Sequence, residues 1–327
     1  MKSKGSIHRG AIALLATVLS FASCIQDLQH YKEINDDEMA LVTLSLSMPS
    51  SPATRSLAGT GAENAIAVVD VLLFNASDEF CYRAHGTKIE DEGNDPYATK
   101  KFEVRLPLGT YNVVVLANAR AAISTSLPIA TIVAGGASRA NVLNGLESTL
   151  PADNKIENTN FPMWGHLASA TITESTSSIS STIDLTRAVA RVDVSVTNGV
   201  DFELTSARLY NYYNKGHVAP EATASNYNTT AVYPAGAKQE DEFVDYDIDE
   251  STSTVAFIET IYAFEAPAGT PVPGTGWGKN TCLVIGGQYD GGSETFYRVE
   301  FVNETDGTLA LTRNHLYDVV IKQVSGH

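Results

Sequence analysis

The sequence has little cysteine, little tryptophan and few basic residues. Of 327 residues only 3 are Cys and 2 are Trp, and 22 Lys and Arg stand against 38 Asp and Glu, which gives a formal net charge of -16. A surface of that sign disfavours nucleic acid and anionic lipid headgroups as partners. No HExxH, GxSxG or phosphate-binding glycine motif occurs, and no Cys/His spacing suits zinc. We therefore expect no enzymatic activity, no catalytic residues, no metal and no cofactor.

The composition nevertheless predicts well-formed hydrophobic cores, because 43% of the residues are apolar and only 18% are charged. Cys81 and Cys282 lie far apart in apparent strands, and we expect two buried free thiols there. A disulfide between them is the alternative in an oxidising compartment.

The first 23 residues have the features of a secretory signal peptide. Basic residues precede a short apolar run at 11–22, which is too short to span a bilayer. The sequence Phe21-Ala22-Ser23-Cys24 resembles a bacterial lipobox, in which the peptide is cut between Ser23 and Cys24 and the thiol carries lipid such as palmitate. Acyl chains there would hold the protein on a membrane without a transmembrane helix.

The stretch 40–56 combines a strand with a loop that favours proteolysis. Thr or Ser separates four apolar residues, the period-2 pattern of a strand with one buried face: Val42, Leu44, Leu46 and Met48. Pro49 ends this pattern, and residues 49–61 are mostly small, Ser, Thr, Pro or Gly around the single cation Arg55. Exposed tips of that composition are where proteases cut.

Downstream, the pattern of short apolar segments predicts an all-β, sandwich-like chain with minor helix. The expected strands are 66–74, 80–84, 102–106, 110–117, 161–173, 183–196, 202–213, 254–263, 281–286, 295–302 and 316–324. We expect an exposed loop at 89–99 and a broken helix within 119–143. The division of the chain is then a leader at 1–23, a removable segment at 24–55 and two domains at 56–182 and 183–327.

An acidic run at 240–250 could bind calcium through carboxylate oxygens. It lacks the Gly and the terminal Glu of an EF-hand loop, so a solvated acidic loop is the favoured interpretation.

Five landmarks in this order resemble the fimbrillins of Bacteroidales, the subunits of the type V pilus. The landmarks are the lipobox at Cys24, the strand and loop ending at 48–59 with Arg55, the segment 111–119 ending in Leu-Ala-Asn-Ala, the Arg-Ala-Val-Ala-Arg core of 185–194, and Arg313-Asn314-His315-Leu316-Tyr317. The resemblance implies two tandem transthyretin-like β-sandwich domains and an outer-membrane lipoprotein precursor.

The resemblance also implies processing. An arginine-specific protease would cut between Arg55 and Ser56, release the displaced strand with its four apolar residues, and let a strand from a neighbouring fimbrial subunit take its place. The chain stops at His327, ten residues after Tyr317, so we expect a tip or accessory subunit in adhesion to a host or bacterial surface ligand. The alternatives are an unprocessed pilus anchor and a surface lipoprotein that binds glycan or protein.

Overall fold

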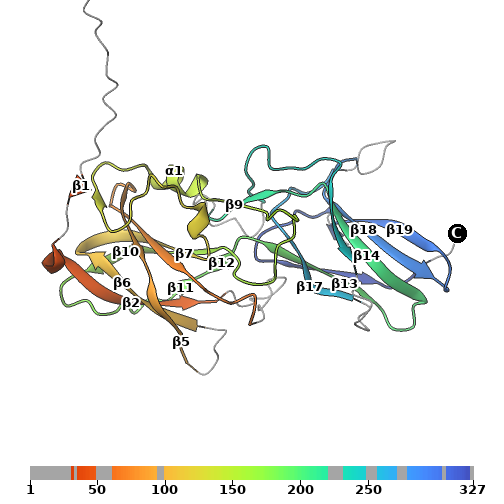
Figure 1. The fold of residues 1–327 in the computed structure, drawn as a ribbon, viewed down its shortest axis with the longest axis horizontal. Coiled ribbons are helices and arrows are strands. Elements are labelled where there is room, and N and C mark those ends of the chain that lie inside the picture. The colour runs from red at the N-terminus through yellow and green to blue at the C-terminus, as the bar shows by residue number, and fades with distance from the viewer. Residues whose placement is uncertain are drawn as a thin grey trace, which may run out of the picture.

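In a computed structural model of the chain, the structure describes residues 31–32, 35–48, 61–93, 99–219, 231–247, 256–270, 278–303 and 307–324. These residues form two groups of strands that lie side by side along the long axis of the molecule (Figure 1). We call them the first and second sandwiches. The prediction of an all-β chain with two sandwiches and little helix is confirmed.

The first sandwich packs a five-stranded sheet against a four-stranded sheet. The five-stranded sheet has the order β12-β10-β7-β3-β4, and the four-stranded sheet has the order β11-β2-β6-β5. The strands are β2 (Met39–Ser47), β3 (Val69–Phe74), β4 (Phe80–His85), β5 (Thr87–Asp91), β6 (Thr99–Pro107), β7 (Gly109–Ala117), β10 (Met163–Ile172), β11 (Ile183–Asp184) and β12 (Thr186–Arg187). One cluster of buried apolar side chains draws on the inner faces of both sheets, so this core holds the two sheets together.

The second sandwich packs a three-stranded sheet against another four-stranded sheet, in the orders β17-β13-β22 and β16-β14-β18-β19. Its strands are β13 (Ala190–Val196), β14 (Phe202–Tyr210), β16 (Phe243–Asp247), β17 (Ala256–Ala263), β18 (Cys282–Tyr289), β19 (Glu294–Glu300) and β22 (Leu316–Ile321). A second buried cluster fills the space between these sheets.

Short elements complete the fold. They are β1 (Tyr31–Lys32) paired with β8 (Ile132–Val133), β9 (Glu147–Thr149) paired with β15 (Lys215–His217), β20 (Val302–Asn303) paired with β21 (Gly307–Thr308), the 3-10 turns at Asp36–Glu38 and Arg120–Ala122, and α1 (Arg139–Asn144). The segment around α1 covers the outer face of the five-stranded sheet with a third apolar cluster. The expected helix within 119–143 is therefore mostly wrong, because this segment is held by its side-chain packing on the sheet rather than by helical bonding.

The expected single strand at 183–196 is also wrong, since it is three strands. β11 joins one sheet of the first sandwich, β12 joins the other, and β13 belongs to the second sandwich. Burial alternates from 183 to 187 and is then continuous through 194. Ile183 and Leu185 pack in the first core, whereas Val192 and Val194 pack in the second. By sheet membership, we propose that the division of the chain lies between β12 and β13 rather than before β11.

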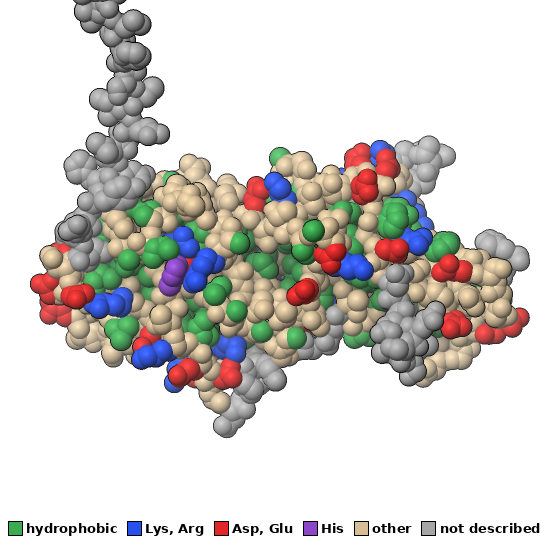
Figure 2. Space-filling model, viewed as in Figure 1, with side chains coloured by type: hydrophobic (Ala, Val, Ile, Leu, Met, Phe, Trp, Pro, Cys, Tyr) green, Lys and Arg blue, Asp and Glu red, His purple; other side chains and the backbone are tan. Residues whose placement is uncertain are grey.

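The expected loop at 89–99 begins as a strand, because β5 pairs with β6 through residue 91. Its side chains are largely exposed, so it is an edge strand without an apolar face. Acidic and basic side chains are scattered over both sandwiches on the face drawn in Figure 2. That face therefore offers no broad basic surface of the kind that binds nucleic acid.

Candidate functional site

β2 is held along one edge for its whole length and along the other only in places. It pairs antiparallel with β6 over nine residues, from Met39 opposite Pro107 to Ser47 opposite Thr99. On its other edge it runs parallel to β11 for two residues. Most of its inter-strand hydrogen bonding is therefore with β6.

That second edge is closed by a few backbone hydrogen bonds. Thr43 N–H donates to Ser177 O over 2.9 Å, and Thr43 O accepts from Ile179 N–H over 3.1 Å. Leu185 N–H donates to Ser47 O over 3.0 Å at the end of the strand. The chain at 177–185 thus forms a partial second wall beside β2.

The side chains of β2 alternate as the sequence predicts. The buried positions are Ala40, Val42, Leu44, Leu46 and Met48, none of which is more than 5% exposed. Leu41 on the opposite face is 53% exposed. Burying each of the larger apolar side chains contributes about 1.5 to 3 kcal/mol, so β2 is a substantial part of the first core.

Residues 63–68, which we call the 63–68 segment, are held in part by two arginines that lie far away in sequence. Glu63 is 2% exposed, and its Oε1 accepts hydrogen bonds from Arg191 Nη1 over 3.1 Å and from the Tyr262 hydroxyl over 2.8 Å. Arg187 donates from Nη2 to the side-chain oxygen of Asn64 and from Nε to Glu63 O over 3.4 Å. Residues from β12, β13 and β17 therefore converge on positions 63 and 64.

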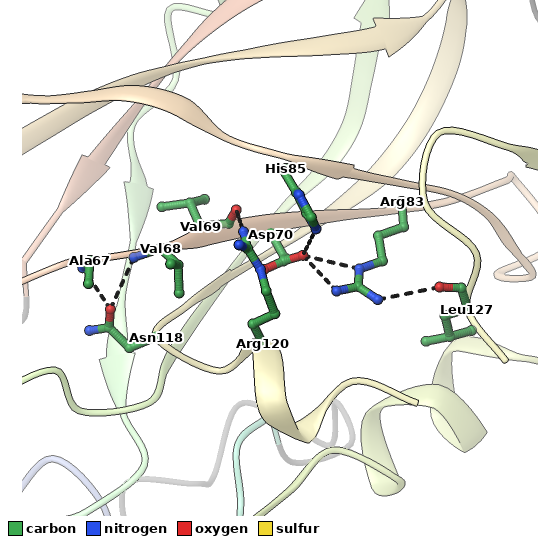
Figure 3. Close-up of polar contacts among 9 residues, drawn as sticks. All are labelled: Ala67, Val68, Val69, Asp70, Arg83, His85, Asn118, Arg120 and Leu127. Carbon is green, nitrogen blue, oxygen red and sulfur yellow. Dashed lines mark hydrogen bonds and ion pairs between the residues drawn. The ribbon is translucent and has the colours of Figure 1, made fainter. Parts of the chain in front are cut away.

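Asn118 holds the next residues of the same segment. Its side-chain oxygen accepts from Ala67 N–H over 2.8 Å and from Val68 N–H over 3.4 Å (Figure 3). Its side-chain nitrogen donates to Ala65 O over 2.8 Å. Asn118 has a positive φ of 55°, a conformation that Asn tolerates better than most residues. The position suits Asn for both its backbone and its side chain.

β3 begins immediately after this segment and carries a buried carboxylate on its outer face. Asp70 is 0% exposed, and its Oδ1 accepts from Arg83 Nε over 3.1 Å and from Arg83 Nη2 over 2.9 Å (Figure 3). Arg120 Nε donates to Asp70 Oδ2 over 2.8 Å, and Arg120 Nη2 donates to Val69 O over 3.2 Å. Asp70 thereby ties β3 to β4 and to the turn after Asn118, since a buried charge needs such partners.

The two arginines of the Arg-Ala-Val-Ala-Arg core differ in their electrostatic environment. Burial lowers the pKa of the Arg187 guanidinium to about 10, although the Glu63 carboxylate acts in the opposite direction. Burial also acts to lower the pKa of Arg191, but hydrogen bonds and charge from Asp193 and Glu63 outweigh it and leave that pKa raised. Both guanidinium groups therefore remain charged at neutral pH.

The late landmark at 313–317 reaches the same region. Arg187 Nη1 donates to the side-chain oxygen of Asn314 over 3.1 Å, and Asn314 N–H donates to Val189 O over 2.7 Å. Next to it, Arg313 is fully buried, donates to the Glu265 carboxylate from Nε over 3.0 Å, and also donates to Val218 O over 2.9 Å. Two landmarks that are separate in the sequence, 185–194 and 313–317, are therefore in direct contact.

Both described cysteines are free and buried. The Cys81 thiol donates to Leu73 O over 3.3 Å. Burial raises the pKa of Cys81 to about 12 and that of Cys282 to about 11, so neither thiol is ionised near neutral pH. These findings favour the expectation of free thiols over a disulfide.

In a protein with Cys24→Ser, we expect a thiol reagent at about pH 8 to leave Cys81 and Cys282 unmodified while the fold is intact. Both should react once denaturant is added, because unfolding returns the thiols to water. The measurement is the number of thiols labelled, read by mass before and after denaturation. Labelling of either cysteine in the native protein at the denatured rate would contradict the burial of that residue.

The acidic run is largely occupied by ion pairs. Lys279 Nζ lies 3.2 Å from Glu240 Oε2 and 2.8 Å from Asp241 Oδ2. Arg208 Nε lies 3.0 Å from Asp245 Oδ1. Asp245 is on β16, so the middle of the expected loop is a strand. In the parts of the chain that the structure describes, no group of three or more His, Cys, Asp or Glu is arranged to hold a metal ion.

Several predicted positions lie outside the described residues. These are the leader at 1–23 with Ser23, the lipidation position Cys24, the cleavage positions Arg55 and Ser56, and the end of the acidic run at 248–250. Within the described residues, every helix is too short or too polar to cross a membrane. The sequence did not predict Glu63 as a buried anchor point. The available signal was a charged residue next to Asn64 within a short stretch that otherwise holds Ala62, Ala65 and Ile66.

Comparison with known proteins identifies the family. A model of the family described as fimbrillin-A associated anchor proteins Mfa1 and Mfa2 matches residues 38–322. The chain belongs to the Mfa2 family. The matched span contains β2, Asn118 and both arginines of the Arg-Ala-Val-Ala-Arg core, so the resemblance to fimbrillins is confirmed.

Among curated relatives of this Mfa2 family member, the major fimbrium tip subunit FimE of Porphyromonas gingivalis is 32% identical over 150 residues. That match covers 43% of this chain and only 26% of the relative, so the chain spans about a quarter of that protein's length.

Solved structures share the fold. The tip fimbrial protein Mfa3 of Porphyromonas gingivalis, with a C-terminal truncation, superposes with a TM-score of 0.52 at 16% identity, covering 88% of this chain and 96% of that one. A putative cell adhesion protein from Parabacteroides distasonis gives a TM-score of 0.52 at 16% identity, covering 87% and 88%. At these identities the likeness establishes the two-sandwich fold alone.

Proposed function

We propose that this chain is a subunit of a cell-surface fimbrium that is exported as an outer-membrane lipoprotein through Cys24 and then activated by proteolysis. A cut between Arg55 and Ser56 releases residues 24–55, which include β2. A strand from a neighbouring subunit then pairs with β6. Membership of the Mfa2 family supports the fimbrial part of this proposal.

The observation that carries the proposal is the way β2 is attached. It contributes an entire buried face to the first core, yet its full-length backbone pairing is with β6 alone. The chain after the 49–60 stretch is held separately by Asn118, Arg187 and Arg191. β2 is therefore a part that the rest of the sandwich could lose and replace.

Loss of β2 would leave a groove, by which we mean the space between β6 and the chain at 177–185. Its floor is the apolar core, including Phe102, Val104 and Leu106 of β6. Its long wall is the unpaired edge of β6, and an open edge of this kind readily accepts another strand. A donor with apolar residues at alternate positions would repeat the pairing that β2 makes, which is β-strand addition.

Arg55→Ala is expected to block removal of residues 24–55 and incorporation into fimbriae, because it removes the cation that an arginine-specific protease recognises. The measurement is the N-terminal mass of the subunit in surface material, with Ser56 expected as the first residue of the unaltered protein. Arg298→Ala is a matched control, since Arg298 lies on β19 of the second sandwich and has a side chain that is 40% exposed and pairs with Glu300. Normal maturation of Arg55→Ala would overturn the processing step.

A second candidate function is a pilus anchor that keeps its lipid and its first strand. The family description, which names anchor proteins, favours it. The name of the curated relative, a fimbrium tip subunit, favours a tip or accessory role in adhesion instead. The N-terminal mass separates the two, since an acylated Cys24 at the start of the mature protein identifies the anchor and Ser56 excludes it.

A further inference from the structure

The partial second wall of the groove contains β11, a strand that is too short to hold its own position. Its two residues pair with Leu46 and Ser47 of β2, and β2 is its neighbour in the four-stranded sheet. The adjoining residue Leu185 donates its N–H to Ser47 O. Removing β2 therefore takes away the strand on which β11 depends for pairing.

Two features keep the neighbourhood of β11 in place without β2. β12 follows directly and pairs with Met163 and Trp164 of β10. The backbone of β11 also lies against Gly165, where an added Cβ would come within 2.5 Å of Asp184 O. A side chain at position 165 would push β11 away, so this glycine permits the close approach of β11 to β10.

Arg187 of β12 supplies a third attachment. It donates hydrogen bonds to Glu63 O and to the side-chain oxygens of Asn64 and Asn314. None of these partners belongs to residues 24–55, so all of them remain when that segment leaves. Bonds from a charged donor to buried acceptors are among the strongest in proteins, and Arg187 is 5% exposed.

We propose that Arg187 is a positioning residue for strand exchange: it ties β11 and β12 to the 63–68 segment, so that removal of β2 opens the sheet without loss of the groove's second wall. This inference rests on the proposed function. Arg191 binds the Glu63 carboxylate and Asn118 binds the backbone at 65, 67 and 68, so Arg187 is tied to a segment that is fixed on the retained side of the cut.

The test uses the full mature chain with a recognition site for a sequence-specific protease placed within 49–60. After cutting, the N-terminal fragment is displaced in moderate urea and removed. Amide hydrogen exchange is measured over 177–187 before and after removal of the fragment. A synthetic peptide of residues 39–48 is then used to measure rebinding to the emptied groove.

In Arg187→Met, exchange over 177–187 is expected to match the unaltered protein within about threefold while β2 is present, since β2 still pairs with β11. After removal of β2, exchange should become at least about tenfold faster than in the unaltered cut protein, and the peptide should bind about tenfold more weakly. Arg139→Met is the matched control, because Arg139 pairs with Asp78 in the same sandwich. It should behave as the unaltered protein in both states.

The inference is overturned if cut Arg187→Met exchanges and binds as cut unaltered protein does. It is also overturned if Arg187→Met speeds exchange equally with β2 present, because that is the result of a merely structural role. Should Arg187→Met fail to fold, Asn64→Ala removes one acceptor of the same side chain and is held to the same criteria. The engineered cut does not depend on Arg55, so normal maturation of Arg55→Ala would overturn the processing proposal without deciding this measurement.

Discussion

Leu44→Ala is expected to lower the free energy of unfolding of the uncut chain by about 2–5 kcal/mol, because it leaves a cavity in the first core. Leu44 is 0% exposed and lies opposite Phe102 of β6 in the ladder. Chemical denaturation of the uncut protein gives this free energy directly. Protein cores are closely packed, and Leu44 lies in the main buried cluster of the first sandwich, so little relaxation is expected to fill the space.

Leu41→Ala is the matched control on the same strand. Its side chain is 53% exposed on the opposite face of β2, so its truncation should change the free energy of unfolding by no more than about 0.5 kcal/mol. Equal effects of the two substitutions would contradict the assignment of Leu44 to the core face.

The same pair of variants tests whether the core face holds β2 in the sheet. After the engineered cut, the N-terminal fragment of Leu44→Ala should dissociate at least about tenfold faster than that of Leu41→Ala, because the fragment has lost buried apolar contact. Dissociation at one common rate would mean that the backbone ladder to β6, rather than the buried side chains, keeps the fragment in place.

Arg313→Met is expected to lower the free energy of unfolding by about 3–5 kcal/mol, since it leaves the Glu265 carboxylate buried without its charged partner. Both side chains are almost completely enclosed, at 0% and 1% exposure. Arg313 also donates to Val218 O and His217 O over 2.9 Å each, and these acceptors lose a donor as well. Urea or thermal denaturation of the variant measures the effect.

The double variant Arg313→Met with Glu265→Leu separates the causes. Removing both charges should recover part of the lost free energy of unfolding, because no uncompensated carboxylate remains in the core. The two carbonyl groups still lack a donor, so full recovery is not expected. A loss below about 1 kcal/mol in the single variant would contradict a structural role for this pair.

The sequence was sufficient to predict the strands with simple burial patterns. From Val42 onward in β2 a Thr or Ser separates successive apolar residues, and in β3 every residue is buried as its nearly continuous apolar run predicts. These patterns are local, because alternation along a strand depends only on the side-chain period of two. β4, β6 and β7 follow from the same reasoning.

Sheet membership could not be predicted in the same way. The residue types of 183–196 predicted one strand, yet the segment contains three strands that belong to three sheets. Periodicity shows that a side chain is buried but does not show which surface buries it. The helix predicted within 119–143 was wrong for a related reason. This segment packs on the outer face of the five-stranded sheet, and that packing rather than a long helix sets its conformation.

The hydrogen bonds that hold the 63–68 segment also could not be predicted from local sequence patterns. Glu63 and Arg191 are separated by 128 positions, and Arg187 and Asn314 by 127. The sequence placed Arg187, Arg191 and Asn314 within family landmarks, but it did not predict which residues they contact. Only folding of both sandwiches brings these side chains within hydrogen-bonding distance.

By itself, the sequence determined that the chain is all-β and that Val42, Leu44, Leu46 and Met48 share one buried face, because these features depend on residue type and short-range spacing. The tertiary structure alone decided that β2 pairs along its length with β6, that β11 pairs with the end of β2, and that Arg187 joins β12 to the 63–68 segment. These are contacts between distant parts of the chain, and their positions are set by the packing of whole sheets.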